Sequence, residues 1–218
     1  MLLARITQPK RRESPVGQLL SEVRLKLDDM ATYLSKILKS YTDFEIAVRE
    51  QIADICAPHC AGCQGVCCRP EFCRENIDSP FLNRISAKTQ PDGAFSEEHG
   101  WLAPTGCVLS VGRPPVCYQF NCNKIIDGLP TAQHRYLVKV LSNLVPYIGK
   151  RSLGTRHIVE IMDPDQLKKV SFTRFGRRLN EAREALHVIQ SYKGPYSSKV
   201  SSHAALSRVI PIPRPLAQ

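Results

Sequence analysis

Cysteine is absent from the first 55 residues and from every position after 122, although the 218-residue chain contains nine cysteines. Because all nine fall in one window, they cannot form a disulfide framework spread over the whole chain. Their odd number and the adjacent pair Cys67-Cys68 also disfavour disulfides within the window, since neighbouring cysteines bond to each other only with backbone strain. The expected role of the window is metal or redox chemistry.

Long hydrophobic runs are also missing. No stretch approaches the roughly 18 uninterrupted apolar residues of a membrane span, and residues 1–20 carry charges where a secretory signal has its apolar centre. We therefore expect no membrane span and a cytoplasmic location, where thiols stay reduced. With 43% hydrophobic residues the chain can bury a core without disulfides.

Acidic residues become scarce in the last third of the chain. The net charge is +10, and residues 123–218 supply the whole excess, with 16 basic and 6 acidic side chains. This region is either a solvated basic surface or a face that attracts an acidic protein or nucleic acid. Aromatic residues interleaved with the basic ones, which would favour nucleic acid, are few.

Glycine and proline are sparse between residues 17 and 55, and apolar residues recur there with alternating steps of three and four. The residues of this seam are Leu20, Val23, Leu27, Met30, Leu34, Ile37, Tyr41, Phe44, Val48 and Ile55. The pattern predicts one long amphipathic helix. Its seam packs either against helices of the same chain, which we favour at this chain length, or against a second copy in a homodimer through residues 20–55.

Proline and glycine are dense in the cysteine window, which predicts loops and short turns. Helical periodicity returns at 131–148, where Pro146 should bend or end the helix, and again at 173–192, while 158–162 reads as a strand or a turn. The predicted organisation is a flexible basic tail (1–16), a long amphipathic helix (17–55), a cysteine-cluster metal-binding region (56–124), a basic helical region (125–192) and an extended or disordered Ser/Pro-rich tail (193–218). The predicted fold class is mainly α, with helices packed around a metal-held loop region and little or no sheet.

The cysteine spacing identifies candidate metal ligands. The predicted ligands are Cys60, Cys63, Cys67, Cys68, Cys107, Cys117 and Cys122. A C-x2-C turn brings two sulfurs close enough to share one ion, and thiolates are ligands for zinc and for iron. Both a structural zinc and a [4Fe–4S] cluster take four ligands, so seven thiols indicate either a polynuclear centre or additional roles for some of them.

The same residues resemble a known family. Cys60-x2-Cys63-x3-Cys67-Cys68-Arg69, then Gly106-Cys107, then Arg113-Pro114-Pro115-Val116-Cys117 and Cys122, is similar to the CxxCxxCC (YkgJ-like) family of proteins described as zinc- or iron-chelating. The resemblance covers about 65 residues, from Cys60 to Lys124. This chain has three residues where the family has two before the vicinal pair, and a long gap from Cys68 to Cys107. The resemblance implies a zinc or iron cofactor, as ion or cluster.

Three functions remain open at this point. The first is a metal-binding protein, and the second is a metal- or cluster-dependent redox or protein-modifying enzyme. The only dense acid/base group near the cysteines is Glu97-Glu98-His99, and Walker, dinucleotide-binding, nucleophile-elbow and HExxH motifs are absent. The third is a zinc-held interaction module with a basic face. Cys56 and Cys73 are expected to be small buried residues rather than ligands, and His59 an ordinary surface histidine.

Overall fold

A computed structural model describes residues 15–60, 69–89, 91, 93–104, 106–192 and 200–211. The side chains of residues 15–31, of Cys60 and of residues 200–202 lie outside this description. The basic tail predicted for 1–16 therefore falls almost entirely outside the described residues, as do Cys63, Cys67 and Cys68.

The chain is mainly α-helical, which confirms the predicted fold class. The elements are α1 (Pro15–Cys60), α2 (Pro70–Cys73), α3 (Glu75–Asp78), α4 (Pro80–Ser86), β1 (Leu102–Ala103), β2 (Gly106–Cys107), α5 (Pro115–Gln119), α6 (Asn123–Asp127), α7 (Ala132–Gly149), the 3-10 helices η1 (Ile158–Glu160) and η2 (Gln166–Lys169), α8 (Phe172–Gln190) and α9 (Val200–Val209). The two short strands pair antiparallel, with Leu102 opposite Cys107 and Ala103 opposite Gly106.

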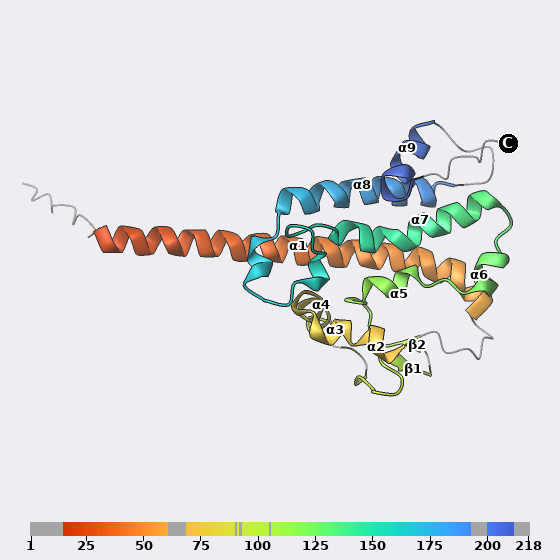
Figure 1. The fold of residues 1–218 in the computed structure, drawn as a ribbon, viewed down its shortest axis with the longest axis horizontal. Helices are drawn as coiled ribbons and strands as arrows, with labels where there is room; N and C mark the ends of the chain where they lie inside the picture. The colour runs from red at the N-terminus through yellow and green to blue at the C-terminus, as the bar shows by residue number, and fades with distance from the viewer. Residues whose placement is uncertain are drawn as a thin grey trace, which may run out of the picture.

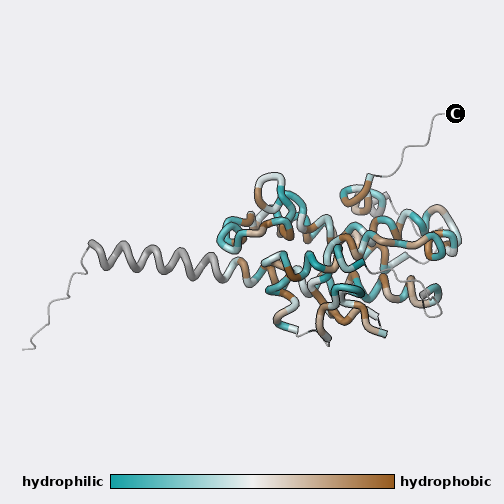
Figure 2. The backbone as a smooth tube through the Cα atoms, turned by 60° about the horizontal axis from the view of Figure 1, so that its bottom comes forward, coloured by the Kyte–Doolittle hydropathy of each residue, from teal (hydrophilic) through white to brown (hydrophobic). Residues whose placement is uncertain are grey.

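Three helices form the body of the molecule. Helix α7 runs back along α1, and α8 returns beside α7 (Figure 1). Each buries the face that its sequence makes apolar, including Tyr41 and Val48 of α1, Leu141 of α7 and Phe175 of α8. Hydrophobic and hydrophilic stretches alternate along these helices, as expected when one face of each helix is buried (Figure 2). Two of these helices have a side-chain N-cap. The Thr131 side chain accepts a hydrogen bond from the His134 N–H at the start of α7, and the Ser171 side chain accepts one from the Arg174 N–H at the start of α8.

The seam of α1 packs within its own chain wherever its side chains are described. Leu34, Ile37, Tyr41, Phe44 and Val48 are buried in the core cluster shared with α7 and α8. Contacts with α4, α6 and η2 add to this packing. The seam residues from Leu20 to Met30 lie outside the described side chains, so a homodimer through that part of the helix remains a prediction.

Two local predictions are settled by hydrogen bonding. Helix α7 continues past Pro146 to Gly149, and the Pro146 carbonyl accepts a hydrogen bond from His157 Nε2 at 2.9 Å. Because Nδ1 of the same ring accepts from the Val159 N–H at 3.3 Å, His157 also caps η1. Within the segment 158–162, residues 158–160 therefore form a 3-10 turn, and no strand is formed there.

The tail prediction for 193–218 was wrong for part of that segment. Residues 200–209 form α9, which packs across α8 and α7 and buries Leu206 and Val209. Arg208 Nη1 reaches Glu184 Oε2 at 2.6 Å, and the Tyr136 hydroxyl donates to the carbonyl of Ile210 at 2.9 Å. The serine content of this stretch predicted a disordered tail, but the segment also has a short apolar face. A helix this short becomes stable only when that face packs on the other helices.

The described part of the cysteine region from α2 to α5 lies on the far side of α1 from α8 and α9 (Figure 1). Its elements are short, as the density of proline and glycine predicts. Among the described helices, none combines the length and apolar character needed to cross a membrane.

Candidate metal centre

Three cysteines from three different segments line one cavity. Its volume is about 180 Å³. The lining residues are Arg69, Phe72, Cys73, Trp101, Cys107, Leu109, Arg113, Pro114, Val116, Cys117 and Phe120. The thiols come from the last residue of α2, from β2 and from the middle of α5. Segments separated by up to 44 residues in sequence therefore meet here.

Cys73 is the most deeply buried of these thiols, with 3% of its surface exposed. Helix α2 begins at Pro70, whose fixed φ suits the first position of a helix. The Cys73 N–H donates to the carbonyl of Arg69 at 3.1 Å, so the two residues lie one turn apart on the same side. Gly100 lies directly against Cys73, because a Cβ atom at Gly100 would come within 2.8 Å of the Cys73 sulfur.

Gly100 is expected to resist substitution for two separate reasons. Its φ of +62° lies in the left-handed region, and the added methyl of Gly100→Ala would also press on Cys73. The left-handed backbone alone costs about 1–2 kcal/mol for alanine. We expect Gly100→Ala to lower the free energy of unfolding by about 3 kcal/mol in urea denaturation, with the contact supplying the remainder.

Gly154 provides the control for this experiment. Its φ is +61°, but a Cβ atom there would meet no heavy atom within 4 Å. Gly154→Ala should therefore lose only the backbone part, about 1–2 kcal/mol. Equal losses for the two variants would show that Gly100 and Cys73 are not packed together.

Cys107 is held by the hairpin and by Arg113. The Val108 N–H donates to the Trp101 carbonyl at 2.9 Å, next to the Leu102–Cys107 pair. Arg113 Nε donates to the Leu109 carbonyl at 2.8 Å, and its Nη2 lies 3.4 Å from the Cys107 carbonyl. The guanidinium group thus fixes the strand that carries Cys107 and places a positive charge at the cavity.

Glu45 of α1 connects the cysteine region to the helical body. Its side chain is fully buried, and Oε2 accepts from the Gly112 N–H at 2.8 Å. Oε1 accepts from the Arg113 N–H at 2.9 Å and from the Tyr118 hydroxyl at 2.6 Å. Burial raises the pKa of Glu45, while these hydrogen bonds and the charge of Arg113 oppose the rise. One carboxyl group therefore holds both the turn before α5 and α5 itself.

The turn at Gly112 admits no side chain. Its φ is +75°, and a Cβ atom there would lie 3.0 Å from the Leu82 carbonyl oxygen and 3.2 Å from Asn76 Nδ2. Asn76 is buried and donates to the Gly112 carbonyl at 2.5 Å. Both backbone polar groups of Gly112 are thus satisfied by side chains from other elements, which positions Pro114 and Pro115 to begin α5 and to present Cys117.

Trp101 contributes an unpaired donor to the cavity lining. Its indole Nε1 is buried and has no hydrogen-bond partner within the part of the chain that the structure describes. A buried donor without a partner is costly, about 1–3 kcal/mol.

The sequence-predicted ligands divide into three groups. Cys107 and Cys117 line the cavity. Cys122 is the N-cap residue of α6 and is not among the described residues lining the cavity. The Cys60 side chain and all of Cys63, Cys67 and Cys68 lie outside the described residues. Across the described residues, no three His, Cys, Asp or Glu side chains lie close enough together to hold a metal ion.

Sequence reasoning missed Cys73 as a lining residue. The expectation that it is buried is confirmed, but it is buried against the cavity rather than in the main core. The sequence signal that could have predicted this is the helix start at Arg69-Pro70. In a helix that starts there, Cys73 lies on the same side as Arg69, which neighbours the predicted ligand Cys68. Cys56 lies on α1 outside the lining, and the ring of His59 packs against Gly128 after α6.

The predicted acid/base group does not line this cavity. Glu97 pairs with Arg74, and His99 Nε2 lies 3.7 Å from Glu98 Oε1 in an exposed turn. All three side chains are more than half exposed. This arrangement fits a surface turn that supports Gly100 rather than a catalytic group.

Comparisons of the chain with protein-family models, with curated proteins and with solved structures found no match. The resemblance to the CxxCxxCC family therefore remains a prediction from the cysteine spacing.

Proposed function

We propose that this protein binds zinc or iron, as ions or as an iron–sulfur cluster, through a cysteine centre at the cavity beside α5. The observation that carries the proposal is that Cys73, Cys107 and Cys117 line one cavity from three segments. Among the described residues no three such side chains are close enough to hold an ion by themselves, so the proposed centre needs further thiols. The remaining thiols would come from the segment between α1 and α2.

Chain connectivity supports this ligand set. Arg69 lines the cavity, and Cys68 is bonded directly to it. Consecutive Cα atoms lie about 3.8 Å apart, so under this proposal a thiol at Cys68 needs little chain length to reach the cavity. Cys60 ends α1 on the other side of the same segment. Metal binding that joins these thiols to the described three would also fix the intervening chain, so that binding free energy becomes folding free energy.

The lining fits a thiolate-bound cation. Four thiolates on a divalent ion leave a net negative charge, and the side chains of Arg69 and Arg113 line the cavity where they can offset it. When bound, zinc would hold the fold or be delivered elsewhere, whereas iron would supply electron transfer. A reducing cytoplasm would keep the thiols available.

The experiment is metal analysis of protein purified without oxygen. We expect either one or two zinc ions per chain and no colour, or several irons per chain in a brown protein that absorbs broadly at the violet end of the visible spectrum, which would indicate a cluster. Folded protein that contains no metal and takes up neither zinc nor ferrous iron with sulfide would contradict the proposal. Far-ultraviolet circular dichroism of the same sample establishes whether the protein is folded.

A metal-dependent enzyme is the second candidate function. The observation that favours it is a second, larger cavity beside α5. Val116 of α5 lines both cavities, so the two lie next to each other. A substrate bound there would be separated from the cysteine centre by a single helix of five residues.

A further inference from the structure

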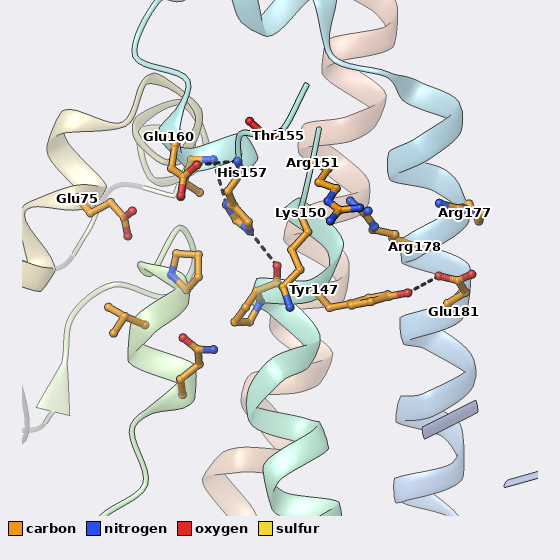
Figure 3. Close-up of a pocket in the computed structure, with 15 residues that line it drawn as sticks. Glu75, Tyr147, Lys150, Arg151, Thr155, His157, Glu160, Arg177, Arg178 and Glu181 are labelled. Carbon is orange, nitrogen blue, oxygen red and sulfur yellow. Dashed lines mark hydrogen bonds between the residues drawn. The ribbon is translucent and has the colours of Figure 1, made fainter. Parts of the chain in front are cut away.

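The second cavity has a volume of about 620 Å³ and lies between α5, the C-terminal end of α7, η1 and α8. Its two walls differ in charge. Lys150, Arg151 and Arg178 lie on one wall, and Glu75 and Glu160 on the other (Figure 3). This separation of charge across one cavity is the feature that the metal proposal leaves unexplained.

The cations of the basic wall have no carboxylate partner. Among the described residues, Lys150, Arg151, Arg177 and Arg178 form no ion pair within 4 Å. Figure 3 shows the guanidinium groups of Arg151 and Arg178 beside each other, with Lys150 below them. Two adjacent guanidinium groups repel each other unless an anion lies between them. The arrangement is therefore one that an anion would stabilise.

Arg178 is the most constrained of these groups. Its guanidinium carbon lies 5.9 Å from the centre of the Tyr147 ring, and Lys150 Nζ lies 6.0 Å from the same centre. Nη1 of Arg178 is buried and has no hydrogen-bond partner in the described part of the chain. Burial and the neighbouring arginines lower the pKa of Arg178. Glu181 lines the cavity on the same side as Arg178 (Figure 3), and its Oε2 accepts a hydrogen bond from the Tyr147 hydroxyl at 2.5 Å. Among the described residues it forms no ion pair with Arg178 within 4 Å.

The backbone at Arg151 has an unusual conformation that a neighbouring side chain stabilises. Arg151 has a φ of +49°, which is uncommon for a residue other than glycine. Its carbonyl accepts a hydrogen bond from Arg174 Nη1 at 2.8 Å, which fixes the turn after α7. Backbone strain of this kind persists where surrounding structure holds it and is concentrated at binding sites.

The acidic wall limits what can occupy the rest of the cavity. Glu160 Oε2 accepts a hydrogen bond from the His157 N–H at 2.8 Å, and its charge acts on Glu75. Among the described residues Glu160 forms no ion pair within 4 Å. Burial and the charge of Glu160 raise the pKa of Glu75. The His157 ring is occupied at both nitrogens and burial lowers its pKa, so it adds no positive charge. A ligand with negative charge along its whole length, such as nucleic acid, would be repelled by this wall.

We infer that the second cavity binds a small molecule that carries one phosphate or carboxylate group, held by Arg151, Arg178 and Lys150. The end of the ligand that faces Glu75 and Glu160 is neutral or cationic. The inference is independent of the metal centre, since every residue that it uses lies outside the cysteine cavity. If both sites exist, the shared residue Val116 places the ligand next to the metal.

The test is isothermal titration calorimetry of the full chain with inorganic phosphate and, separately, with acetate, at constant ionic strength. We expect saturable one-site binding of at least one of the two, and the tighter probe identifies the anion class. Arg178→Gln and Arg151→Gln should each weaken that binding at least about tenfold, because each removes a charge-assisted contact. Glu75→Gln should leave the affinity unchanged or increase it, since it removes a negative charge.

Arg183→Gln is the matched control. Arg183 is an exposed residue of α8 outside the cavity lining, so its loss lowers the net charge equally without touching the site. Its affinity for the probe should equal that of the wild type. Absence of saturable binding of both anions by the folded wild type would overturn the inference. A loss in Arg183→Gln equal to that in Arg178→Gln would also overturn it, because binding would then depend only on overall charge.

Discussion

Replacing Glu45 with alanine is expected to lower the free energy of unfolding by about 3 kcal/mol or more. The substitution removes the acceptor for two backbone N–H groups and for the Tyr118 hydroxyl, all buried or half-buried beside α1. Each buried donor left unpaired costs about 1–3 kcal/mol. In a chain of this length such a loss corresponds to a fall in Tm of roughly 6–12 °C. Chemical and thermal denaturation measure both quantities.

Glu50→Ala is the control for this prediction, because Glu50 is an exposed glutamate on the same helix. We expect a change of at most about 0.5 kcal/mol there. A similarly small effect at Glu45 would mean that its three hydrogen bonds do not hold the segment before α5. Because that segment carries Cys117, Glu45→Ala should also reduce metal retention under the proposed function.

The pH dependence of Glu45 has a definite sign. Burial raises its pKa in the folded protein above the ordinary value of about 4.3. A raised pKa means that the folded state favours the protonated group, so this contribution to stability is complete below pH ~4 and is lost as the pH rises through the folded-state value. The difference in unfolding free energy between wild type and Glu45→Gln should therefore fall as the pH is raised from 4 to about 8. A difference that rises over this range would contradict the assigned direction.

The helical body could be predicted because each of its helices carries a periodic apolar pattern. The apolar seam of α1 and the apolar repeats of α7 and α8 are local properties of the sequence. Burying these faces stabilises a helix in any compact arrangement of the chain. The structure ends each of these helices within a few residues of the predicted limits. Helix α9 was missed because a ten-residue segment with few apolar positions is not helical on its own.

The candidate sites could be predicted only in part, because their geometry depends on contacts between distant residues. Glu45 reaches Gly112 and Tyr118, which lie 67 and 73 positions away. No periodicity marks such a pair. Arg178 Nη1, which has no hydrogen-bond partner among the described residues, is equally unmarked in the sequence, where Arg178 belongs to an ordinary run of basic residues. Cysteine, by contrast, is rare enough that its clustering alone led to the prediction of a metal centre, which stays a proposal.

If the proposed metal centre exists, Cys73→Ser should weaken metal binding at least about tenfold, which is the lower end of the loss seen when an outer contact of a metal site is removed. Serine preserves the size of the side chain, but a hydroxyl is a poor ligand for zinc or iron compared with a thiolate. Cys73 is the most buried thiol of the cavity, so solvent cannot readily replace its sulfur. Metal retained after dialysis against a chelator, measured by elemental analysis, gives the result.

Cys56→Ser is the matched control, since Cys56 lies on α1 outside the residues that line the cavity. It should retain the wild-type metal content. The hydroxyl of a buried serine can itself destabilise the fold. The two variants are therefore compared only if circular dichroism shows that Cys73→Ser has the helix content of the wild type. A folded Cys73→Ser protein with full metal content would remove Cys73 from the ligand set. The centre would then have to be assembled from Cys107, Cys117 and the thiols of the segment before α2.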